Sequence, residues 1–568
     1  MSRTTQITDA VLASSGGITG AETPAPAPGT EAPALIENLQ DLGEFIQTPA
    51  GIALVVIAVF ILLGITAGLA WLWGTVMPRP GMATRGEIRE VMGEKHAREM
   101  IDQTRPSLIG REKETPVTEY ALPLGKTRHG WPTSIYATPE DNMLVLGPPR
   151  QGKSLFLDTL IYEFPGAVVH TSSKVKDHLN TKDLRQLVGP VWVWDPQRLD
   201  SSDISTFKWN PVIGCQDRDV ALQRAAYLLY GARKDPGAGI DQFFKDTAAE
   251  VLARFLNAAA LGKLTMVDVY RWTHARDNDD AIQLLMRHGA DQDWINLLRA
   301  RQNVVEGTGD GIWTTLSSAL GWMSNPHVAR TVAPGPGEDF DPEKFLLNRG
   351  TLYMIGADEP GSAIAPLYVL FLDFLRRAAI RLGNRVGGRM DPPLLMALDE
   401  VATIVPVPLD LWMPDSGGKG ITLVAAVQSK AQLRSRWGDA KGEVIWGAVN
   451  ILVVLRGIVD TRVLKELSEL CDTYTKTRTT HSRAQDGKVT TSTSDVEKPV
   501  MTASQIRKLP RRRLLVFFPG ASPVITALRP LYKRRDVKAI RSGKTQVTRA
   551  RVPGPRGATT VMLDKEDV

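Results

Sequence analysis

Residues 142–164 read NMLVLGPPRQGKSLFLDTLIYEF, and this stretch indicates the class of fold. The run NMLVLG is short and apolar, as is typical of a buried strand, while SLFLDTLIYEF is typical of a helix. Between them GPPRQGKS matches the pattern GxxxxGK[ST] in full. A glycine-containing loop that joins a strand to a helix in this way is typical of a phosphate-binding loop.

The loop predicts a nucleotide site that also holds a magnesium ion. Backbone N–H groups of such a loop surround the phosphates, and the Lys153 ammonium neutralises the β- and γ-phosphates. The Ser154 hydroxyl is expected to bind Mg²⁺. A fortuitous turn is the alternative, but the strand-loop-helix setting disfavours it. The residues expected to contact ATP are Gly147, Pro148, Pro149, Arg150, Gln151, Gly152, Lys153 and Ser154.

A second motif supplies the carboxylates that nucleotide hydrolysis needs. Asp399 and Glu400 directly follow the apolar run LLMAL, in the manner of a Walker B motif. We expect Asp399 to bind the metal together with Ser154, and Glu400 to act as the base for water. An acidic pair ends many ordinary strands, so the prediction rests on its combination with the loop. Lys153 and Asp399 are 246 positions apart, which requires an inserted domain between the motifs.

Further apolar runs alternate with helical segments, and this alternation predicts a parallel α/β sheet. Residues 212–340 break the alternation, because they show helical spacing and almost no strand-like runs. We therefore expect an all-α insertion there. The expected strands are Ala167–His170, Val191–Trp194, Thr351–Ile355, Leu394–Leu398, Ile421–Val427 and Ile451–Leu455, with LLVFF and PVITAL as closing strands.

The amino-terminal region predicts a membrane anchor. Residues 1–45 are acidic and rich in Pro and Ala, which predicts a disordered arm. Residues 50–74 carry no charge, and about 20 apolar residues suffice to cross a bilayer, so 46–77 is predicted as a transmembrane helix. A cleavable signal peptide would be shorter and preceded by basic residues. Basic residues after the span place the following chain in the cytoplasm and the amino terminus outside.

Composition and charge set the remaining expectations. The 568 residues carry a net charge of +6, and a basic chain suits a polyanionic partner or an anionic membrane surface. The only cysteines, Cys215 and Cys471, are far apart, which disfavours a disulfide framework or a zinc site. The chain is expected to divide into a juxtamembrane linker with leading strands (78–141), a nucleotide-binding domain in two parts (142–211 and 341–532) around the all-α domain (212–340), and a basic disordered tail (533–568).

Gln428 follows the predicted strand Ile421–Val427, so it is expected at the carboxyl edge of the sheet, where ligands of such sheets bind. Its amide is suited to orient water or to sense the γ-phosphate, although an ordinary solvated loop glutamine is the alternative. Other strings of this chain are LLMALDE, GGKGITLVAAVQSKAQLRSRWG, TSSKVKDHL, WDP, WNP and KLPRRRLLVFFPGASPVI. In these strings the chain resembles the TraG/TraD-type coupling proteins of conjugative type IV secretion.

The resemblance covers residues 142–531 and implies a function. Members of that family anchor in the inner membrane and form a RecA-like hexamer with an all-α cap. They deliver single-stranded DNA bound to a relaxase to the proteins of the secretion channel. By position, Lys153 and Ser154 would hold nucleotide and Mg²⁺, Asp399 and Glu400 would serve metal and water, and Gln428 would be the sensor. The implied chain is a DNA-translocating ATPase with a RecA-like P-loop domain, an inserted all-α domain and one amino-terminal transmembrane helix.

The chain departs from the family pattern at two places. Family members commonly have two membrane spans, whereas the sequence predicts one. An arginine is usual before the strand that leads to the glutamine, and this chain has Lys419 there. A lysine supplies the charge of a trans-acting finger but not its planar fork. Arg456 and Arg462 are alternative candidates.

Other functions and roles stay open. A chromosome pump of the FtsK type would end in a winged-helix module, and the chain after residue 531 is too short and too polar for one. A substrate receptor for protein secretion, with nucleotide-driven assembly, is a further alternative. The strand and strand-edge positions of Trp192, Trp194 and Trp209 favour packing in the core over stacking on DNA bases. Basic residues that fit either a DNA channel or a solvated surface are Lys174, Lys176, Lys430, Arg434 and Arg436.

Overall fold

The computed structural model describes residues 48–76, 79–128, 132–200, 204–232, 239–303, 306–357, 364–483 and 489–543. The chain divides into two units, Met1–Gly74 and Thr75–Val568, which are described separately. The predicted arm (1–45) and most of the predicted tail lie outside the described residues.

The apolar stretch near the amino terminus forms helix α2, Pro49–Val76. Its large apolar side chains from Ile52 to Ile65 are exposed. Within the described part of the chain, no helix is both long enough and apolar enough to cross a membrane. The transmembrane helix predicted for residues 46–77 is therefore not shown by the structure.

The second unit is built around an eleven-stranded sheet with the order β2-β1-β13-β12-β9-β3-β8-β7-β4-β6-β5. The seven strands from β9 to β5 are parallel, as the alternation of strands and helices predicts. They are β3 Met143–Leu146, β4 Val168–Ser172, β5 Val191–Trp194, β6 Thr351–Ile355, β7 Leu394–Leu398, β8 Ile421–Val427 and β9 Ile451–Val454. The antiparallel edge consists of β1 Leu122–Thr127, β2 Ser134–Ala137, β12 Arg513–Phe517 and β13 Val524–Ala527.

The central strands are apolar runs because both faces of the sheet are covered. Alternate residues of β3 enter two different cores: Leu144 and Leu146 lie in one, Met143 and Val145 in the other. Helix α16 (Ala365–Arg385) packs into the first core, and helix α6 (Lys153–Glu163) into the second. The mixed α/β fold with a large parallel sheet is confirmed.

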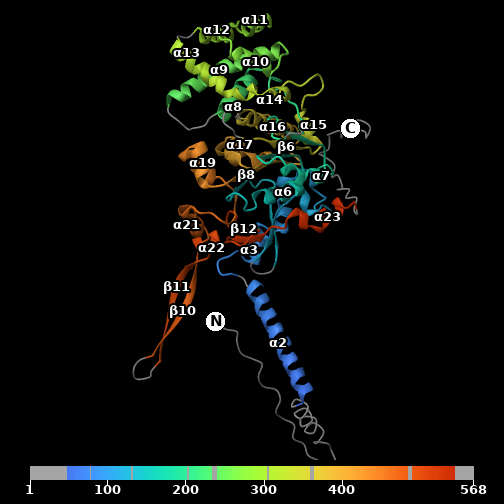
Figure 1. Cartoon of the computed structure of the whole chain (residues 1–568), viewed down its shortest axis with the longest axis vertical. Coiled ribbons are helices and arrows are strands. Elements are labelled where there is room, and N and C mark those ends of the chain that lie inside the picture. Colours follow the sequence, from blue (N-terminus) through green and yellow to red (C-terminus); the bar gives the residue numbers. More distant parts are fainter. Residues whose placement is uncertain are drawn as a thin grey trace, which may run out of the picture. The chain divides into compact units, whose positions relative to one another are not determined.

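The described part of residues 212–340 contains helices and no strand (Figure 1). Its apolar side chains belong to the same continuous core as one face of the sheet, so the helical insertion is anchored on that face. Trp194 and Trp209 are buried there and both contact the ring of Phe371, which confirms that they pack in the core. The helices are α8 Arg218–Ala232, α9 Gly239–Leu261, α10 Met266–Thr273, α11 Asp280–Arg287, α12 Gln292–Gln302, α13 Glu306–Ala319 and α14 Pro326–Thr331.

The remaining helices flank the strands. Those before the nucleotide-binding loop are α3 Arg85–Val91, α4 Glu94–Glu99 and α5 Ile101–Thr104. Later in the chain come α7 Lys182–Arg185, α15 Pro342–Leu347, α17 Val401–Ile404, α18 Leu409–Ser416, α19 Lys430–Trp437, α20 Asp439–Gly447, α21 Thr461–Leu470 and α22 Ala503–Arg507.

The chain near its carboxyl end is more ordered than the sequence predicts. Helix α23, Arg535–Arg541, lies within the segment expected to be disordered from residue 533. Arg541 pairs with Asp183 at 2.8 Å, and Val537 is buried. The prediction is wrong for this helix, because a run of basic residues can pair with acidic side chains of a folded surface, which composition alone does not reveal.

A long hairpin was not predicted at all. Strands β10 (Thr473–Arg483) and β11 (Val489–Pro499) form a separate two-stranded sheet between α21 and α22. Figure 1 shows this ribbon extending away from the large sheet of the same unit.

Candidate nucleotide site

The loop between β3 and α6 has the backbone that a phosphate-binding loop requires. Gly152 has a φ of +111°, a conformation that favours glycine, directly before the helix starts at Lys153. A Cβ on Gly147 would lie 2.8 Å from the Cβ of Leu455, so a larger residue would disturb the neighbouring segment. The glycines of the motif thus satisfy local backbone and packing constraints.

The Lys153 side chain is buried at the centre of the loop. Its ammonium donates hydrogen bonds to the carbonyl oxygens of Gly147 (2.7 Å) and Pro148 (3.3 Å). Burial lowers the pKa of Lys153, while the carboxylates of Asp399 and Glu400 act in the opposite direction. The loop therefore holds a cation at the place where phosphates would be neutralised.

Ser154 and Asp399 are brought together by the order of the strands. The Ser154 hydroxyl donates a hydrogen bond of 3.1 Å to Oδ2 of Asp399. The Thr171 hydroxyl, on β4, donates to the backbone oxygen of Asp399 at 3.1 Å and fixes the end of β7. A hydroxyl and a carboxylate oxygen are ligands that Mg²⁺ accepts beside phosphate and water. The residues present therefore fit Mg²⁺ with a nucleotide.

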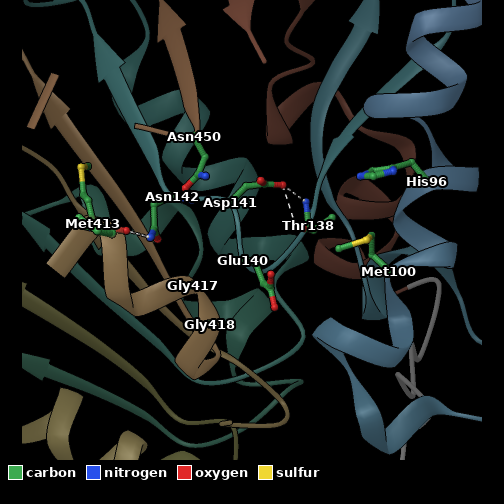
Figure 2. Close-up of a pocket in the computed structure, with 11 residues that line it drawn as sticks. His96, Met100, Thr138, Glu140, Asp141, Asn142, Met413, Gly417, Gly418 and Asn450 are labelled. Carbon is green, nitrogen blue, oxygen red and sulfur yellow. Dashed lines mark hydrogen bonds between the residues drawn. The ribbon is translucent and has the colours of Figure 1, made fainter. Parts of the chain in front are cut away.

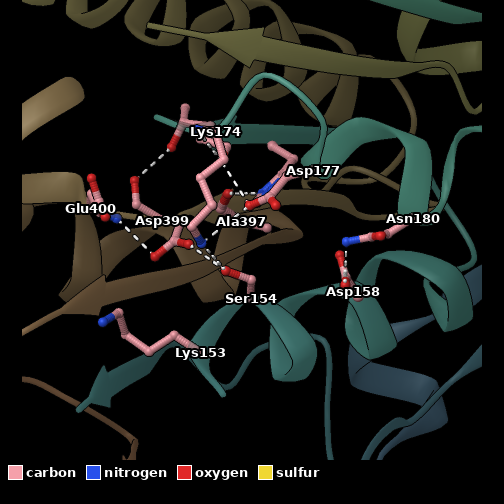
Figure 3. A network of polar contacts seen from close by, with 12 residues as sticks. Lys153, Ser154, Asp158, Lys174, Asp177, Asn180, Ala397, Asp399 and Glu400 are labelled. Atoms are coloured by element: carbon pink, nitrogen blue, oxygen red, sulfur yellow. Dashed lines mark hydrogen bonds and ion pairs between the residues drawn. The ribbon is translucent and has the colours of Figure 1, made fainter. Parts of the chain in front are cut away.

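Glu400 lies beside this pair in a left-handed backbone conformation, with φ 51° and ψ 43°. Its N–H donates to Oδ1 of Asp399 at 3.0 Å, so the backbone of this turn holds the Asp399 carboxylate. Figure 3 shows Glu400, Asp399 and Ser154 together, with Lys153 alongside. A non-glycine residue in this region of backbone space is strained, a feature that often occurs at functional sites.

Gln428 lies at the same edge of the sheet. Strands β3 and β8 are parallel with Leu146 opposite Val427, and the Gly147 N–H donates to the Val427 oxygen at 3.1 Å. Gln428, the next residue, is half-buried beside the loop. The structure therefore brings it to the predicted nucleotide site.

Lys419 does not join this site within its own chain. It lies in the 3-10 turn η5 (Gly417–Lys419) before β8, at the amino edge of the sheet. The seven residues of β8, about 23 Å of strand, separate it from the edge that carries Gln428. Arg456 instead follows β9 at the carboxyl edge, where the Leu455 N–H donates to the Leu146 oxygen at 2.8 Å. Arg462 lies in the first turn of α21 and is exposed.

Three residues near the site were not assigned from the sequence. The Lys174 ammonium donates to the Ser154 hydroxyl at 2.9 Å and lies 3.6 Å from the Asp177 carboxylate. Asp158, one turn after Ser154 on α6, accepts a hydrogen bond of 3.0 Å from Asn180. Burial, together with the nearby Asp177, raises the pKa of Asp158 to about 8. The string TSSKVKDHL contains Lys174 and Asp177, but a string of polar residues does not show which of them face a ligand.

Lys430 has a structural role. The sequence leaves open whether it lies in a DNA channel or on a solvated surface, and the structure shows neither. Its side chain is buried, and its ammonium pairs with Glu443 and Glu466, each at 3.0 Å. The ammonium also lies 4.6 Å from the ring centroid of Trp446. Arg436 donates to the Gly231 oxygen at 3.0 Å and so links α19 to α8.

A separate pocket lies at the amino edge of the sheet, near η5, and Figure 2 shows its lining. Its polar groups bind the chain itself: Asp141 accepts from the Thr138 N–H and hydroxyl, and Asn142 donates to the Met413 oxygen at 2.6 Å. Burial raises the pKa of Asp141. We assign no ligand to this pocket.

One segment of the sequence matches a known protein family. Residues 393–511 match the family model described as the TraM recognition site of TraD and TraG. The predicted resemblance to TraG/TraD-type coupling proteins is confirmed. The matched segment contains Asp399, Glu400, Lys419 and Gln428 as well as the β10–β11 hairpin.

Solved structures share the fold. The bacterial conjugative coupling protein TrwB, in an unbound form, matches with a TM-score of 0.52 and 19% identity, over 69% of this chain and 85% of that chain. TrwB in complex with ADP and Mg²⁺ matches with a TM-score of 0.52 and 19% identity, over 69% and 86% of the two chains. At this identity the likeness shows a common fold. No curated protein matches the chain by sequence.

Proposed function

We propose that this chain is an ATP-hydrolysing coupling protein that drives DNA into a type IV secretion channel during conjugation. The observation that carries the proposal is the 3.1 Å contact between Ser154 and Asp399, because it joins the ends of two motifs 245 residues apart into one metal-binding arrangement. The TraG/TraD segment and the TrwB-like fold connect this nucleotide site to conjugation.

The side chains at the site have distinct roles in the proposed hydrolysis. Lys153 would neutralise the phosphates from inside the loop, and Ser154 and Asp399 would hold Mg²⁺. Bound Mg²⁺ would supply charge that stabilises the leaving phosphate oxygens. Glu400 accepts the proton of the attacking water, and Gln428 orients that water or senses the phosphate. Each of these groups lies at the carboxyl edge of the parallel strands, where ligands of such sheets bind.

A homo-hexamer is proposed for the working assembly, with Lys419 acting on the nucleotide of a neighbouring subunit. The position of Lys419 at the amino edge of β8 supports this role, since it is remote from the loop of its own chain. Arg456 follows Leu455, whose backbone lies beside the β3–α6 loop of the same chain. Arg456 is therefore better placed to act within the same subunit. In a ring every subunit makes the same interface, so a nucleotide site shared between two subunits would recur at each interface.

The proposed partners are single-stranded DNA with its relaxase and the proteins of the secretion channel. The family matched by residues 393–511 is described as a recognition site for TraM, so this segment is the proposed contact for a protein of the DNA-processing complex. In the described residues after β13, the chain forms the turn Leu531–Lys533 and helix α23.

The proposed location is the inner membrane, with the amino terminus outside and the nucleotide site in the cytoplasm. Support comes from the uncharged segment 50–74, the 28-residue helix formed over it, and the basic residues that follow. Protease added to intact spheroplasts should remove an amino-terminal tag, whereas a carboxyl-terminal tag should stay protected. Protection of both tags would contradict this orientation.

The experiment that tests the function is the ATPase rate of the full chain in nanodiscs, with and without single-stranded DNA and over a range of protein concentrations. A DNA pump should hydrolyse faster with DNA and above the concentration at which rings form. A substrate receptor that uses nucleotide only for assembly should bind ATP without DNA-stimulated turnover. The latter result would replace the proposed function.

A further inference from the structure

The β10–β11 hairpin is long, exposed and unsupported by other strands. Each strand has eleven residues, so the ribbon extends about 35 Å from its base. Its described side chains are exposed except for the half-buried Tyr474. Two-stranded ribbons are marginally stable in water without a partner surface. The hairpin is therefore a candidate for a surface that another molecule covers.

The strand register separates the charges of the ribbon onto its two faces. Directly opposite residues of an antiparallel pair share a face, and successive residues alternate between faces. One face, called the basic face below, carries Lys476, Arg478, Tyr474 and Thr480 on β10. Opposite them on β11 lie Val496, Ser494, Lys498 and Ser492. This face has three positive charges and no acidic residue among its described members.

The other face carries both acidic residues of β11. Glu497 lies opposite Thr475, and Asp495 lies opposite Thr477. The Thr477 hydroxyl donates to Asp495 at 2.9 Å, so this acid is satisfied within the ribbon. Among the described residues, by contrast, the three cations of the basic face form no ion pair with the chain. The basic face is therefore the one that fits an anionic partner.

The base of the hairpin contacts the segment that follows the apolar helix. Gly81 packs directly against Val500, the residue after β11. The contact is so close that a Cβ on Gly81 would overlap the valine side chain. Helix α2 ends at Val76, and a chain of five residues spans at most about 18 Å. A membrane entered by α2 would thus be within reach of the hairpin, whatever the direction of the helix.

We propose that the basic face of the hairpin lies on anionic lipid headgroups at the membrane surface. Lysine and arginine beside a membrane are attracted by its negative surface potential, and Tyr474 and Val496 add the mixed polar and apolar character of an interface. The short tether to α2 favours a lipid surface over nucleic acid as the anionic partner. The proposal rests on the proposed membrane anchoring.

The test uses the full chain in nanodiscs of phosphatidylcholine, with or without phosphatidylglycerol, that contain a headgroup-linked nitroxide quencher. A fluorophore is attached to Ser494→Cys on the basic face or to Thr493→Cys on the opposite face. The native Cys215 and Cys471 are buried, and the unsubstituted chain serves as the control for their labelling. We expect strong quenching only for Ser494→Cys and only in anionic discs. Equal quenching on both faces, or none, would overturn the proposal.

Charge variants make the result specific. The combination Lys476→Glu, Arg478→Glu and Lys498→Glu should reduce quenching at position 494 to the level of neutral discs. The matched combination Asp495→Lys and Glu497→Lys, on the other face, should leave it unchanged. Quenching that survives the first combination would overturn the proposal. Both combinations should keep normal ATPase activity, because no residue of the nucleotide site lies in the hairpin.

Two further readouts separate the possible failures. If the chain does not co-elute with nanodiscs, the membrane anchoring is wrong and the lipid proposal fails with it. If it co-elutes but the label is not quenched by lipid, only the hairpin proposal fails. A quencher-labelled single-stranded DNA that reaches position 494 in neutral and anionic discs alike would show that the basic face binds nucleic acid, which also overturns the proposal. If the unsubstituted chain shows no ATPase activity, the proposed function fails and the hairpin proposal does not.

Discussion

The ammonium of Lys174 lies 2.9 Å from the hydroxyl oxygen of Ser154, and the carboxylate of Asp399 lies 3.1 Å from the same oxygen. Ser154 thus lies between a positive charge and a negative charge at the proposed metal site. Two cations cannot share this small space without repulsion. Lys174 must therefore move or be displaced when Mg²⁺ binds to Ser154.

Replacement of this ammonium should change the magnesium dependence of hydrolysis. In Lys174→Met the Mg²⁺ concentration for half-maximal ATPase should fall roughly threefold or more, because a competing cation is gone from a partly exposed position. Ser154→Ala should shift it in the opposite direction, since a metal ligand is lost. A Mg²⁺ titration at fixed ATP measures both. An increase for Lys174→Met would mean that its ammonium assists metal or phosphate binding instead.

Lys153→Ala should abolish hydrolysis and DNA transfer. The buried ammonium that neutralises the phosphates would be lost, and the expected decrease in turnover is about 100-fold or more. The matched control is Lys176→Ala, an exposed lysine nearby in the chain. Thermal unfolding should show that both variants fold. Normal turnover in Lys153→Ala would contradict the assignment of the site.

Glu400→Gln should bind ATP normally but turn it over far more slowly, because an amide cannot accept the proton of water. Nucleotide affinity measured by fluorescence of a labelled analogue, beside steady-state hydrolysis, separates the two effects. If binding and hydrolysis fall together, Glu400 instead maintains the strained turn after β7. Asp399→Asn is the comparison, since it removes a proposed metal ligand and should weaken Mg²⁺ binding as well.

Lys419→Ala should lower hydrolysis about 100-fold or more while nucleotide affinity and ring formation persist, because a trans cation stabilises the transferred phosphoryl charge. Lys419→Arg should keep or raise the rate. Mixed rings of Lys419→Ala and Lys153→Ala subunits should recover activity at about a quarter of the interfaces, where an intact loop meets an intact Lys419.

Two outcomes would contradict this placement of the trans cation. Absence of recovery in mixed rings would show that Lys419 does not act across the interface. A silent Lys419→Ala together with an inactive Arg456→Ala or Arg462→Ala would move the essential cation to the carboxyl edge of the sheet.

Asp158 should make the stability of the nucleotide-free chain depend on pH. Burial raises its pKa to about 8, whereas an unfolded aspartate has a pKa of about 4. Between these values the folded state holds one more proton, so stability falls as pH rises and the loss is complete above about pH 8. In Asp158→Asn this dependence should disappear, and the unfolding temperature at pH 9 should exceed that of the unsubstituted chain. A constant difference from pH 5 to pH 9 would contradict the shifted pKa.

The nucleotide site was largely predictable because its requirements are local. Gly147, Gly152, Lys153 and Ser154 act within one strand-loop-helix unit, and their spacing alone satisfies the backbone geometry. Asp399 was predictable because a fully buried parallel strand is a continuous apolar run, so its polar end is conspicuous. The parallel sheet and the helical insertion follow from the same pattern of apolar spacing.

The hairpin and the role of Lys430 were not predictable in the same way. The string TYTKTRTTHSR alternates threonine with basic residues and contains almost no apolar residue, so hydrophobic periodicity gives no strand signal. The burial of Lys430 depends on Glu443, Glu466 and Trp446, which reach it from later helices. Neither feature is encoded in a window of neighbouring residues.

The sequence by itself determined the presence of the phosphate-binding loop, the acidic strand end and the alternation that builds a parallel sheet. Only the tertiary structure decided that Lys174 touches Ser154, that Lys419 lies at the opposite edge from its own nucleotide site, and that the hairpin separates its charges by face. The reason is physical: local motifs depend on backbone geometry within a few residues, whereas strand order and register depend on the packing of apolar faces from the whole chain.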